Sequence, residues 1–359
     1  MERLLRTDDY IAQMAKPGLE VAQSIALGVG DVLIVCAGFE DRAVEVLSRA
    51  SKIGSVGFDV IAVEYHPHIV DNKRAIIEDL CAKCRSRISW CVYDRKNPAG
   101  GGMQIVSAIG RCARVFVDIS GMSRLLIVQL LVELFAKIDD ARDVCIFYVE
   151  AAQYPPTKSD VEKVFAHMQE DQNYAFLFLS SGVFEVCVVP ELSSVSLPGQ
   201  PLRLIAFPSF NPDQLTALRT EIQSAEITLI QGNPPAQEHQ WRTEAIKRLN
   251  FTDNIARCDQ REASTLDYRG TADILIQVYR KFGQMERLVI APTGSKMQTV
   301  AVALIRAFLD DIQIVYPTPR TFKTQEYTVG ATNIYCLPMR PFFDLYGTLR
   351  KEHLVQQLW

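Results

Sequence analysis

Two predicted strand-to-helix turns combine hydroxyl side chains, a glycine and a cation. The first turn reads Asp-Ile-Ser-Gly-Met-Ser-Arg over residues 118–124, and the second reads Ala-Pro-Thr-Gly-Ser-Lys-Met over residues 291–297. Hydroxyl and backbone N–H groups can donate hydrogen bonds to phosphate oxygens, while arginine or lysine supplies the opposite charge. The turns therefore predict an anionic ligand bound by these residues: Ser120, Gly121, Ser123, Arg124, Thr293, Gly294, Ser295 and Lys296. The alternative interpretation is ordinary helix capping, with glycine for close packing.

Another small-residue turn follows the first predicted strand, over residues 38–42. Its glycine permits close approach of a ligand or of another backbone segment. Arg42 lies in the first turn of the predicted helix, where the helix dipole disfavours a cation, so we expect it to pair with Glu40, with Asp41 or with a ligand phosphate. The predicted ligand-binding set therefore also contains these residues: Gly38, Phe39, Glu40, Arg42 and, at the matching place in the second half, Ser209.

Several well-defined motifs are absent from the sequence. The chain has no GxxxxGK[ST], so ATP hydrolysis by a P-loop is disfavoured, and it has neither the dinucleotide GxGxxG nor the hydrolase GxSxG. Cys81 and Cys84 form a CxxC, but no second ligand pair accompanies it at zinc-site spacing. We predict ordinary cysteines there, with metal or redox chemistry as the alternative, and we expect no bound metal or cofactor.

The elements that position these turns alternate along the chain, which predicts an α/β fold with mainly parallel sheets. Ten strands are expected, at Val32–Cys36, Val60–Glu64, Ile88–Tyr93, Val115–Ile119, Val144–Val149, Arg203–Phe207, Ile227–Gln231, around Asn254–Arg257, Leu288–Ala291 and Ile312–Tyr316. Helices are expected near 41–50, 70–83, 103–110, 123–137, 159–169, 213–223, 237–249, 264–282 and 297–309.

The second half repeats the order of the first, and this predicts an internal duplication. Four pairs of segments correspond in order, namely 36–39 with 207–210, 64–67 with 231–234, 120–121 with 293–294, and 182–190 with 330–338. We therefore predict two tandem Rossmann-like units, residues 1–192 and 202–359, joined by a Ser-, Pro- and Gly-containing linker at 193–201. Each unit is expected to end in a β-hairpin, the first with arms at 174–179 and 183–190 around a turn at Ser180–Gly182, and the second with arms at 325–329 and 331–338 around Gly330. The second unit is also expected to end in an amphipathic helix.

Composition excludes some classes of partner. The chain has 359 residues, 48% of them hydrophobic and 22% charged, which is typical of a globular protein. Its net charge of −4 argues against duplex DNA or an anionic membrane as a partner. No signal peptide or membrane-spanning run is recognisable, and the nine cysteines are scattered through apolar contexts. We expect a cytoplasmic protein with reduced thiols.

The turn at 292–297, Pro-Thr-Gly-Ser-Lys-Met, resembles the T-G-G-T-K-x-M stretch of the CARF domain family, although one glycine stands in place of two. Residues 118–124 resemble it more weakly, and the related SAVED domains are regarded as fused CARF-like pairs. The resemblance implies a pair of CARF-like units that bind a cyclic oligonucleotide in a pocket shared between them. It also implies a role in prokaryotic antiviral signalling through an effector, and because no effector motif is recognisable here, that effector would be a separate protein.

The predicted turns and the resemblance leave three candidate functions. The first is a sensor for a nucleotide second messenger. The second is a metal-independent, ring-nuclease-like phosphodiesterase, in which Ser295 and Lys296 are the candidate catalytic residues that orient a ribose hydroxyl. The third is a non-catalytic assembly subunit of a defence complex.

Overall fold

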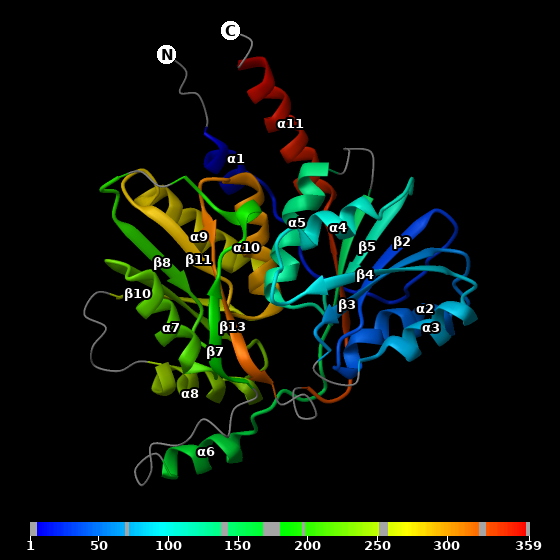
Figure 1. Cartoon of the computed structure of the whole chain (residues 1–359), viewed down its shortest axis with the longest axis horizontal. Helices are drawn as coiled ribbons and strands as arrows, with labels where there is room; N and C mark the ends of the chain where they lie inside the picture. The colour runs from blue at the N-terminus through cyan, green and yellow to red at the C-terminus, as the bar shows by residue number, and fades with distance from the viewer. Residues whose placement is uncertain are drawn as a thin grey trace. The chain divides into compact units, whose positions relative to one another are not determined.

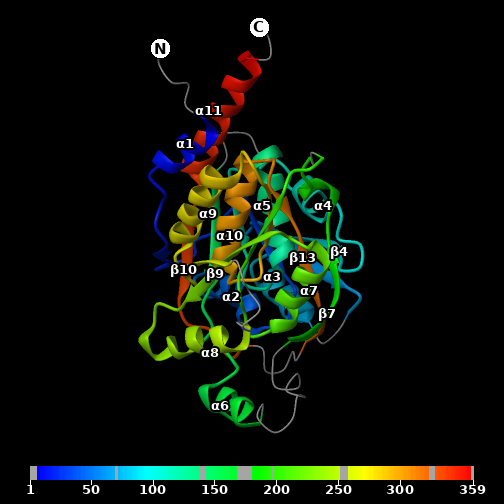
Figure 2. The ribbon, with the colours of Figure 1, turned by 90° about the vertical axis from the view of Figure 1, so that its left-hand side faces the viewer.

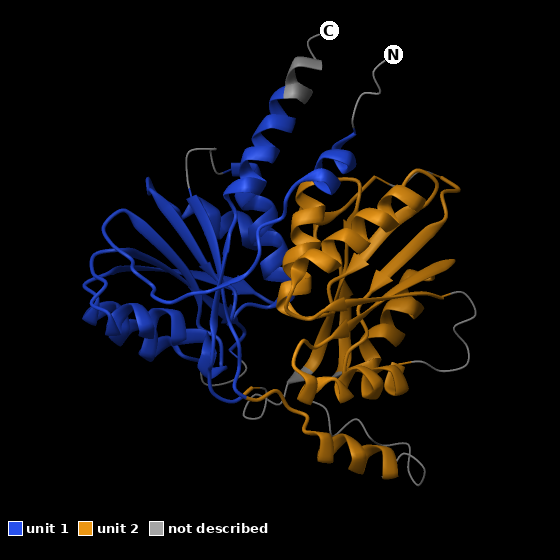
Figure 3. Cartoon of the chain, turned by 180° about the vertical axis from the view of Figure 1, so that it is seen from behind, with its two compact units in different colours: residues 1–152, 329–359 blue, residues 153–328 orange. Residues whose placement is uncertain are grey.

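The computed structural model describes residues 6–68, 72–137, 143–167, 180–195, 198–250, 258–322 and 328–356. Two compact units are present and are described separately (Figure 3). Unit 1 comprises residues 1–152 and 329–359, and unit 2 comprises residues 153–328. The boundaries differ from the predicted ones, because the predicted linker at 193–201 lies inside unit 2 and the chain returns to unit 1 at residue 329.

Unit 1 is built on a seven-stranded sheet in the order β1-β14-β6-β5-β2-β3-β4. Its strands are β1 (Glu20–Val21), β2 (Asp31–Cys36), β3 (Asp59–His66), β4 (Arg87–Asp94), β5 (Arg114–Asp118), β6 (Asp143–Val149) and β14 (Ile334–Pro338). Strands β2 to β6 run parallel, whereas β14 is antiparallel to both β6 and β1. All six residues of β2 are buried, as the continuous apolar run in its sequence predicts for a central parallel strand.

The helices of unit 1 cover both faces of this sheet (Figure 1). They are α1 (Thr7–Gln13), α2 (Glu45–Lys52), α3 (Arg74–Lys83), α4 (Gly101–Ser107), α5 (Arg124–Lys137) and α11 (Arg340–Gln356). Helices α2 and α3 pack their apolar sides on one face, through residues such as Leu47 and Ile77, while α4 and α5 lie on the other. The predicted C-terminal helix is confirmed as α11, and its Phe343 ring stacks on Phe135 of α5 with centroids 4.3 Å apart.

Unit 2 holds a five-stranded parallel sheet in the order β10-β9-β8-β11-β12 and a separate pair, β13 with β7. Its strands are β7 (Ser180–Cys187), β8 (Leu202–Ala206), β9 (Glu226–Asn233), β10 (Cys258–Ser264), β11 (Arg287–Ala291), β12 (Gln313–Ile314) and β13 (Tyr316–Phe322). The strand predicted around 254–257 lies outside the described residues, and β10 begins directly after them.

The helices of unit 2 are α6 (Lys158–His167), α7 (Pro212–Ile222), α8 (Trp241–Asn250), α9 (Tyr268–Phe282) and α10 (Lys296–Phe308). These helices also lie on both faces of the parallel sheet of unit 2, except α6, which contacts α8 (Figure 1). Leu215 and Leu218 of α7 pack on β8 and β9, whereas α9 and α10 lie side by side on the opposite face (Figure 2). The chain is therefore α/β with mainly parallel sheets, as predicted.

In each unit we number the parallel strands in chain order, from β2 in unit 1 and from β8 in unit 2. Both sheets place the first parallel strand between the second and the fourth. In unit 1, β2 pairs with β3 and β5, and in unit 2, β8 pairs with β9 and β11. The chain reverses its winding direction between the first and fourth strands, and ligands of open α/β sheets bind at the carboxyl end of such a switch point. Because many unrelated proteins share this order, the internal duplication stays a prediction.

The expected terminal hairpins are not formed by the described segments. Ser180 to Gly182, predicted as a hairpin turn, belong instead to the continuous strand β7, which pairs antiparallel with β13. The segment after Gly330 forms β14, which pairs with β6 in the unit 1 sheet. The expected first arm at 174–179 lies outside the described residues, as do residues 325–327 of the arm expected at 325–329. The partner that the structure shows for each segment is therefore a strand distant in sequence, β13 for β7 and β6 for β14.

The prediction of reduced thiols is wrong for one pair of cysteines. Cys145 of β6 and Cys336 of β14 form a disulfide, with their Cα atoms 6.6 Å apart, while the other seven cysteines form no disulfide. The strands that carry them are adjacent only because residues 334–338 cross to the unit 1 sheet, which the sequence pattern does not indicate.

Within the described residues, no helix has both the length and the apolar character that a bilayer crossing requires.

Candidate functional site

The carboxyl edge of unit 1 brings together the loops after β2 and β5. A Cβ atom on Gly38 would lie 3.2 Å from the carbonyl oxygen of Gly121, and one on Gly121 would lie 2.7 Å from the carbonyl oxygen of Cys36. The two turns thus touch backbone to backbone, because neither glycine carries a side chain between them. The structure therefore brings two of the predicted site residues together at the switch point.

Arg42 and Glu40 form a buried ion pair in the first of these loops. The Arg42 Nε donates to Glu40 Oε2 at 2.8 Å, and Arg42 Nη2 lies 2.7 Å from the same oxygen. The guanidinium also donates to the hydroxyl of Tyr148 and to the carbonyl of Val149, at 3.3 and 3.2 Å. Of the partners expected for Arg42, the structure shows the neighbouring acid Glu40, and Phe39 lies half-buried beside the pair.

Ser120, in the loop after β5, forms a hydrogen bond with the end of β6. Its hydroxyl accepts the N–H of Val149 at 2.8 Å, and its own N–H donates to the Asp118 carboxylate at 2.9 Å. The side chain is completely buried. The hydroxyl predicted to contact a ligand thus makes an internal hydrogen bond that fixes the turn.

Ser123 and Tyr65 meet where α5 begins. The hydroxyl of Tyr65 accepts the Ser123 N–H at 2.5 Å, and the Ser123 hydroxyl accepts the N–H of Leu126 at 3.3 Å. Burial raises the pKa of Tyr65 well above its usual range, and the Arg95 guanidinium lies 4.4 Å from the centre of its ring. Arg124, half-buried, is the first residue of the helix. Tyr65 was not among the predicted site residues, because its place beside α5 depends on the pairing of strands distant in sequence.

In unit 2, Thr293 joins the loop after β11 to the end of β8. Its hydroxyl donates to the carbonyl of Phe207 at 2.7 Å and accepts the Phe207 N–H at 3.1 Å. Two residues further on, the Ser209 hydroxyl accepts the N–H of Asn211 at 3.1 Å. The equivalent loops are therefore adjacent in both units, but a side-chain hydroxyl joins them in unit 2 where two glycines meet in unit 1.

The first turn of α10 is held by a capping box. The Ser295 hydroxyl accepts the N–H of Gln298 at 3.1 Å, and the Gln298 Oε1 accepts the N–H of Ser295 at 2.9 Å. Ser295 also donates its hydroxyl proton to the carbonyl of Thr265 at 2.6 Å. A Cβ atom on Gly294 would lie 2.4 Å from Gln298 Oε1, so glycine leaves room for this amide. Lys296 is the first helical residue and is half-buried.

Gln298 was not among the predicted site residues, although its side chain lies in this turn. The pattern Ser-x-x-Gln at 295–298 could have revealed it, because a glutamine three residues after an N-cap serine reaches back to the start of its helix.

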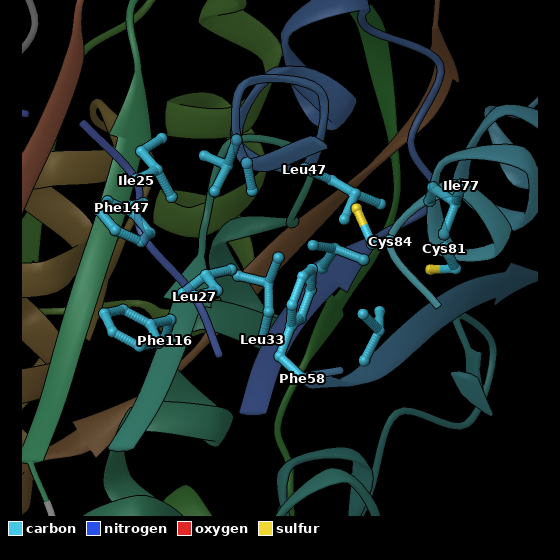
Figure 4. Packing of buried hydrophobic residues seen from close by; sticks show 14 of the residues in the cluster. Ile25, Leu27, Leu33, Leu47, Phe58, Ile77, Cys81, Cys84, Phe116 and Phe147 are labelled. Carbon is cyan, nitrogen blue, oxygen red and sulfur yellow. The ribbon is translucent and has the colours of Figure 1, made fainter. Parts of the chain in front are cut away.

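The CxxC cysteines lie in the core of unit 1. Cys81 and Cys84 are both buried in the apolar cluster that also contains Leu47 and Ile77 (Figure 4). Burial raises the pKa of Cys81 to about 12, with smaller contributions from Cys84 and Glu78. Among the described residues, no group of three His, Cys, Asp or Glu side chains is placed to hold a metal ion. The geometry therefore favours ordinary core cysteines.

Cys81 is expected to resist alkylation by iodoacetamide in the native protein at pH 8, because thiolates react and this buried thiol stays protonated. Its folded pKa of about 12 exceeds the ordinary value of 9.0, so its contribution to stability is complete below pH 9 and is lost as pH rises towards 12. Mass spectrometry of alkylated peptides and urea denaturation at pH 8 and 10 would check both statements. Rapid native labelling of Cys81 would contradict them.

Comparison with known proteins yields no family. No protein-family model matches the chain, and no curated protein matches it. Among solved structures, the cytoplasmic domain of a prokaryotic cation chloride cotransporter aligns with 80% of this chain and 95% of its own, at 8% identity and a TM-score of 0.25. NadR protein in complex with NR aligns with 81% of this chain and 92% of its own, at 8% identity and a TM-score of 0.24. Similarities this weak say nothing about the site.

Proposed function

We propose that the protein is a sensor that binds a nucleotide second messenger, of the cyclic oligonucleotide type, at the carboxyl edges of its parallel sheets. The observation that carries this proposal is the contact between the loops after the first and fourth strands in each unit. In unit 1 the contact is made by Gly38 and Gly121, and in unit 2 by Thr293 and Phe207. Open parallel sheets bind their ligands at this position.

Charge at the same edges supports an anionic ligand. Arg124 begins α5 and Lys296 begins α10, and each helix starts directly after the fourth strand of its unit. The cation and the positive end of the helix dipole both favour an anion bound at these helix starts. Because the hydroxyls of Ser120 and Thr293 already make internal hydrogen bonds, recognition would depend on backbone N–H groups and cations.

The phosphodiesterase alternative gains no support from Ser295, since its hydroxyl is occupied as a donor to Thr265 and as an acceptor from Gln298. In the proposed role, ligand binding would shift the population of conformations and so signal to a separately encoded effector of prokaryotic antiviral defence.

Isothermal titration with cyclic di-, tri- and tetranucleotides is expected to give saturable binding for at least one of them. Lys296→Ala should weaken that binding about tenfold, because a hydrogen bond to a charged group is lost. A linear dinucleotide serves as the ligand control. If no member of the panel binds the wild-type protein, the proposed function is wrong.

A further inference from the structure

The helices that follow the fourth strands, α5 and α10, differ in the hydrogen-bond donors that their first turns can present to a ligand. In unit 1, the N–H of Ser123 at the start of α5 already donates to the Tyr65 hydroxyl at 2.5 Å. That phenol occupies the position beside this N–H that a bound anion would need, and its residue is buried. The start of α5 is thus covered by a side chain of its own unit.

In unit 2, the corresponding turn carries a buried donor that lacks a hydrogen-bond partner. Gln298, on the first turn of α10, is only 1% exposed, and its Nε2 makes no hydrogen bond. The amide orientation is defined, because Oε1 must be the atom that accepts the Ser295 N–H. A buried donor without an acceptor costs about 1–3 kcal/mol, so an acceptor from outside the chain is favoured at this position.

The unused Nε2 is directed towards the carboxyl edge of the sheet. It lies 3.8 Å from the position that a Cβ atom on Gly232, near the end of β9, would occupy. The hydroxyl of Ser295 binds the carbonyl of Thr265, which follows β10, and this bond holds the helix start against the same edge. A Cβ atom on Gly294 would lie 2.4 Å from Gln298 Oε1, so the two glycines, Gly232 and Gly294, place no side chain of their own against the amide.

We infer that the start of α10 is an oxyanion site in which Gln298 Nε2 donates a hydrogen bond to a phosphate oxygen of the ligand, whereas the start of α5 is closed by Tyr65. This inference rests on the proposed function and assigns the phosphate contact to unit 2. A phosphate suits the site because its oxygens are strong acceptors, and the positive end of the helix dipole favours their charge. Gln298 thereby joins Lys296 as a binding residue.

Gln298→Glu tests the inference, with inorganic pyrophosphate as the probe. Glutamate preserves the capping box, since its carboxylate can still accept the Ser295 N–H, but it replaces the donor with a negative acceptor. We expect isothermal titration to show pyrophosphate affinity reduced by about 10- to 100-fold, the scale of a lost hydrogen bond to a charged group. Gln277→Glu, on the exposed side of α9, adds the same charge to unit 2 and should leave the affinity unchanged.

A second measurement does not depend on the variant. In protein labelled with ¹⁵N-glutamine, the side-chain amide resonance of Gln298 should shift when pyrophosphate is added. The inference is overturned if wild-type protein does not bind pyrophosphate, if Gln298→Glu binds it as tightly as wild type, or if this resonance stays in place. Because pyrophosphate is not a nucleotide, these outcomes are separate from a failure of the cyclic nucleotide panel, which would remove the proposed function.

Discussion

Glu40→Leu is expected to lower the free energy of unfolding by about 3–5 kcal/mol, the cost of leaving a buried charge without its partner. Arg42 is 4% exposed and Glu40 is 7% exposed, so water cannot replace the lost carboxylate. The Tyr148 hydroxyl and the Val149 carbonyl, which also accept from the guanidinium, are neutral and compensate only in part. Urea denaturation followed by circular dichroism would measure the change.

The double variant Glu40→Leu/Arg42→Met is the matched control for this experiment. Replacing both charges by apolar groups of similar size is often close to neutral, so most of the lost stability should return. A single variant as stable as wild type would contradict a structural role for the ion pair. If the double variant folds but no longer binds the nucleotide panel, Arg42 also has the ligand contact expected from its sequence position.

Gly121→Ala is expected to destabilise the protein by about 1–3 kcal/mol, because the added methyl group has no space. Its Cβ atom would lie 2.7 Å from the Cys36 carbonyl oxygen and 2.9 Å from the Ala43 Cβ. The first of these neighbours is backbone in the central strand of the sheet and cannot move aside without disturbing β2. The same denaturation assay would measure this change.

Gly270→Ala provides the contrasting control. Gly270 lies within α9 and has nothing within 4 Å of its Cβ position, so alanine should stabilise the helix by about 0.5–1 kcal/mol. A Gly121→Ala protein that keeps its stability but loses nucleotide binding would show that this glycine serves ligand approach and not the packing of the two turns.

Local sequence pattern located the candidate turns, whereas the hydrogen bonds that their hydroxyls make depend on the tertiary structure. Glycines and hydroxyls after the fourth strands do lie at the switch points, because a run of buried apolar residues followed by a helical period defines a strand-to-helix turn. Whether a hydroxyl there binds a ligand depends on which backbone groups come near it. Ser120 meets Val149, and Thr293 meets Phe207, through strand pairings that no local pattern encodes.

The amino-acid sequence by itself determined the alternation of strands and helices, the α/β class and the position of the turns with glycine, hydroxyl and cation. These features follow from hydrophobic periodicity and local turn chemistry, which act over a few residues. Only the tertiary structure decided that residues 334–338 join the sheet of unit 1, that β7 pairs with β13, and that Tyr65 closes the start of α5. A strand presents the same backbone groups to any partner, so the choice of sheet edge depends on contacts between distant segments.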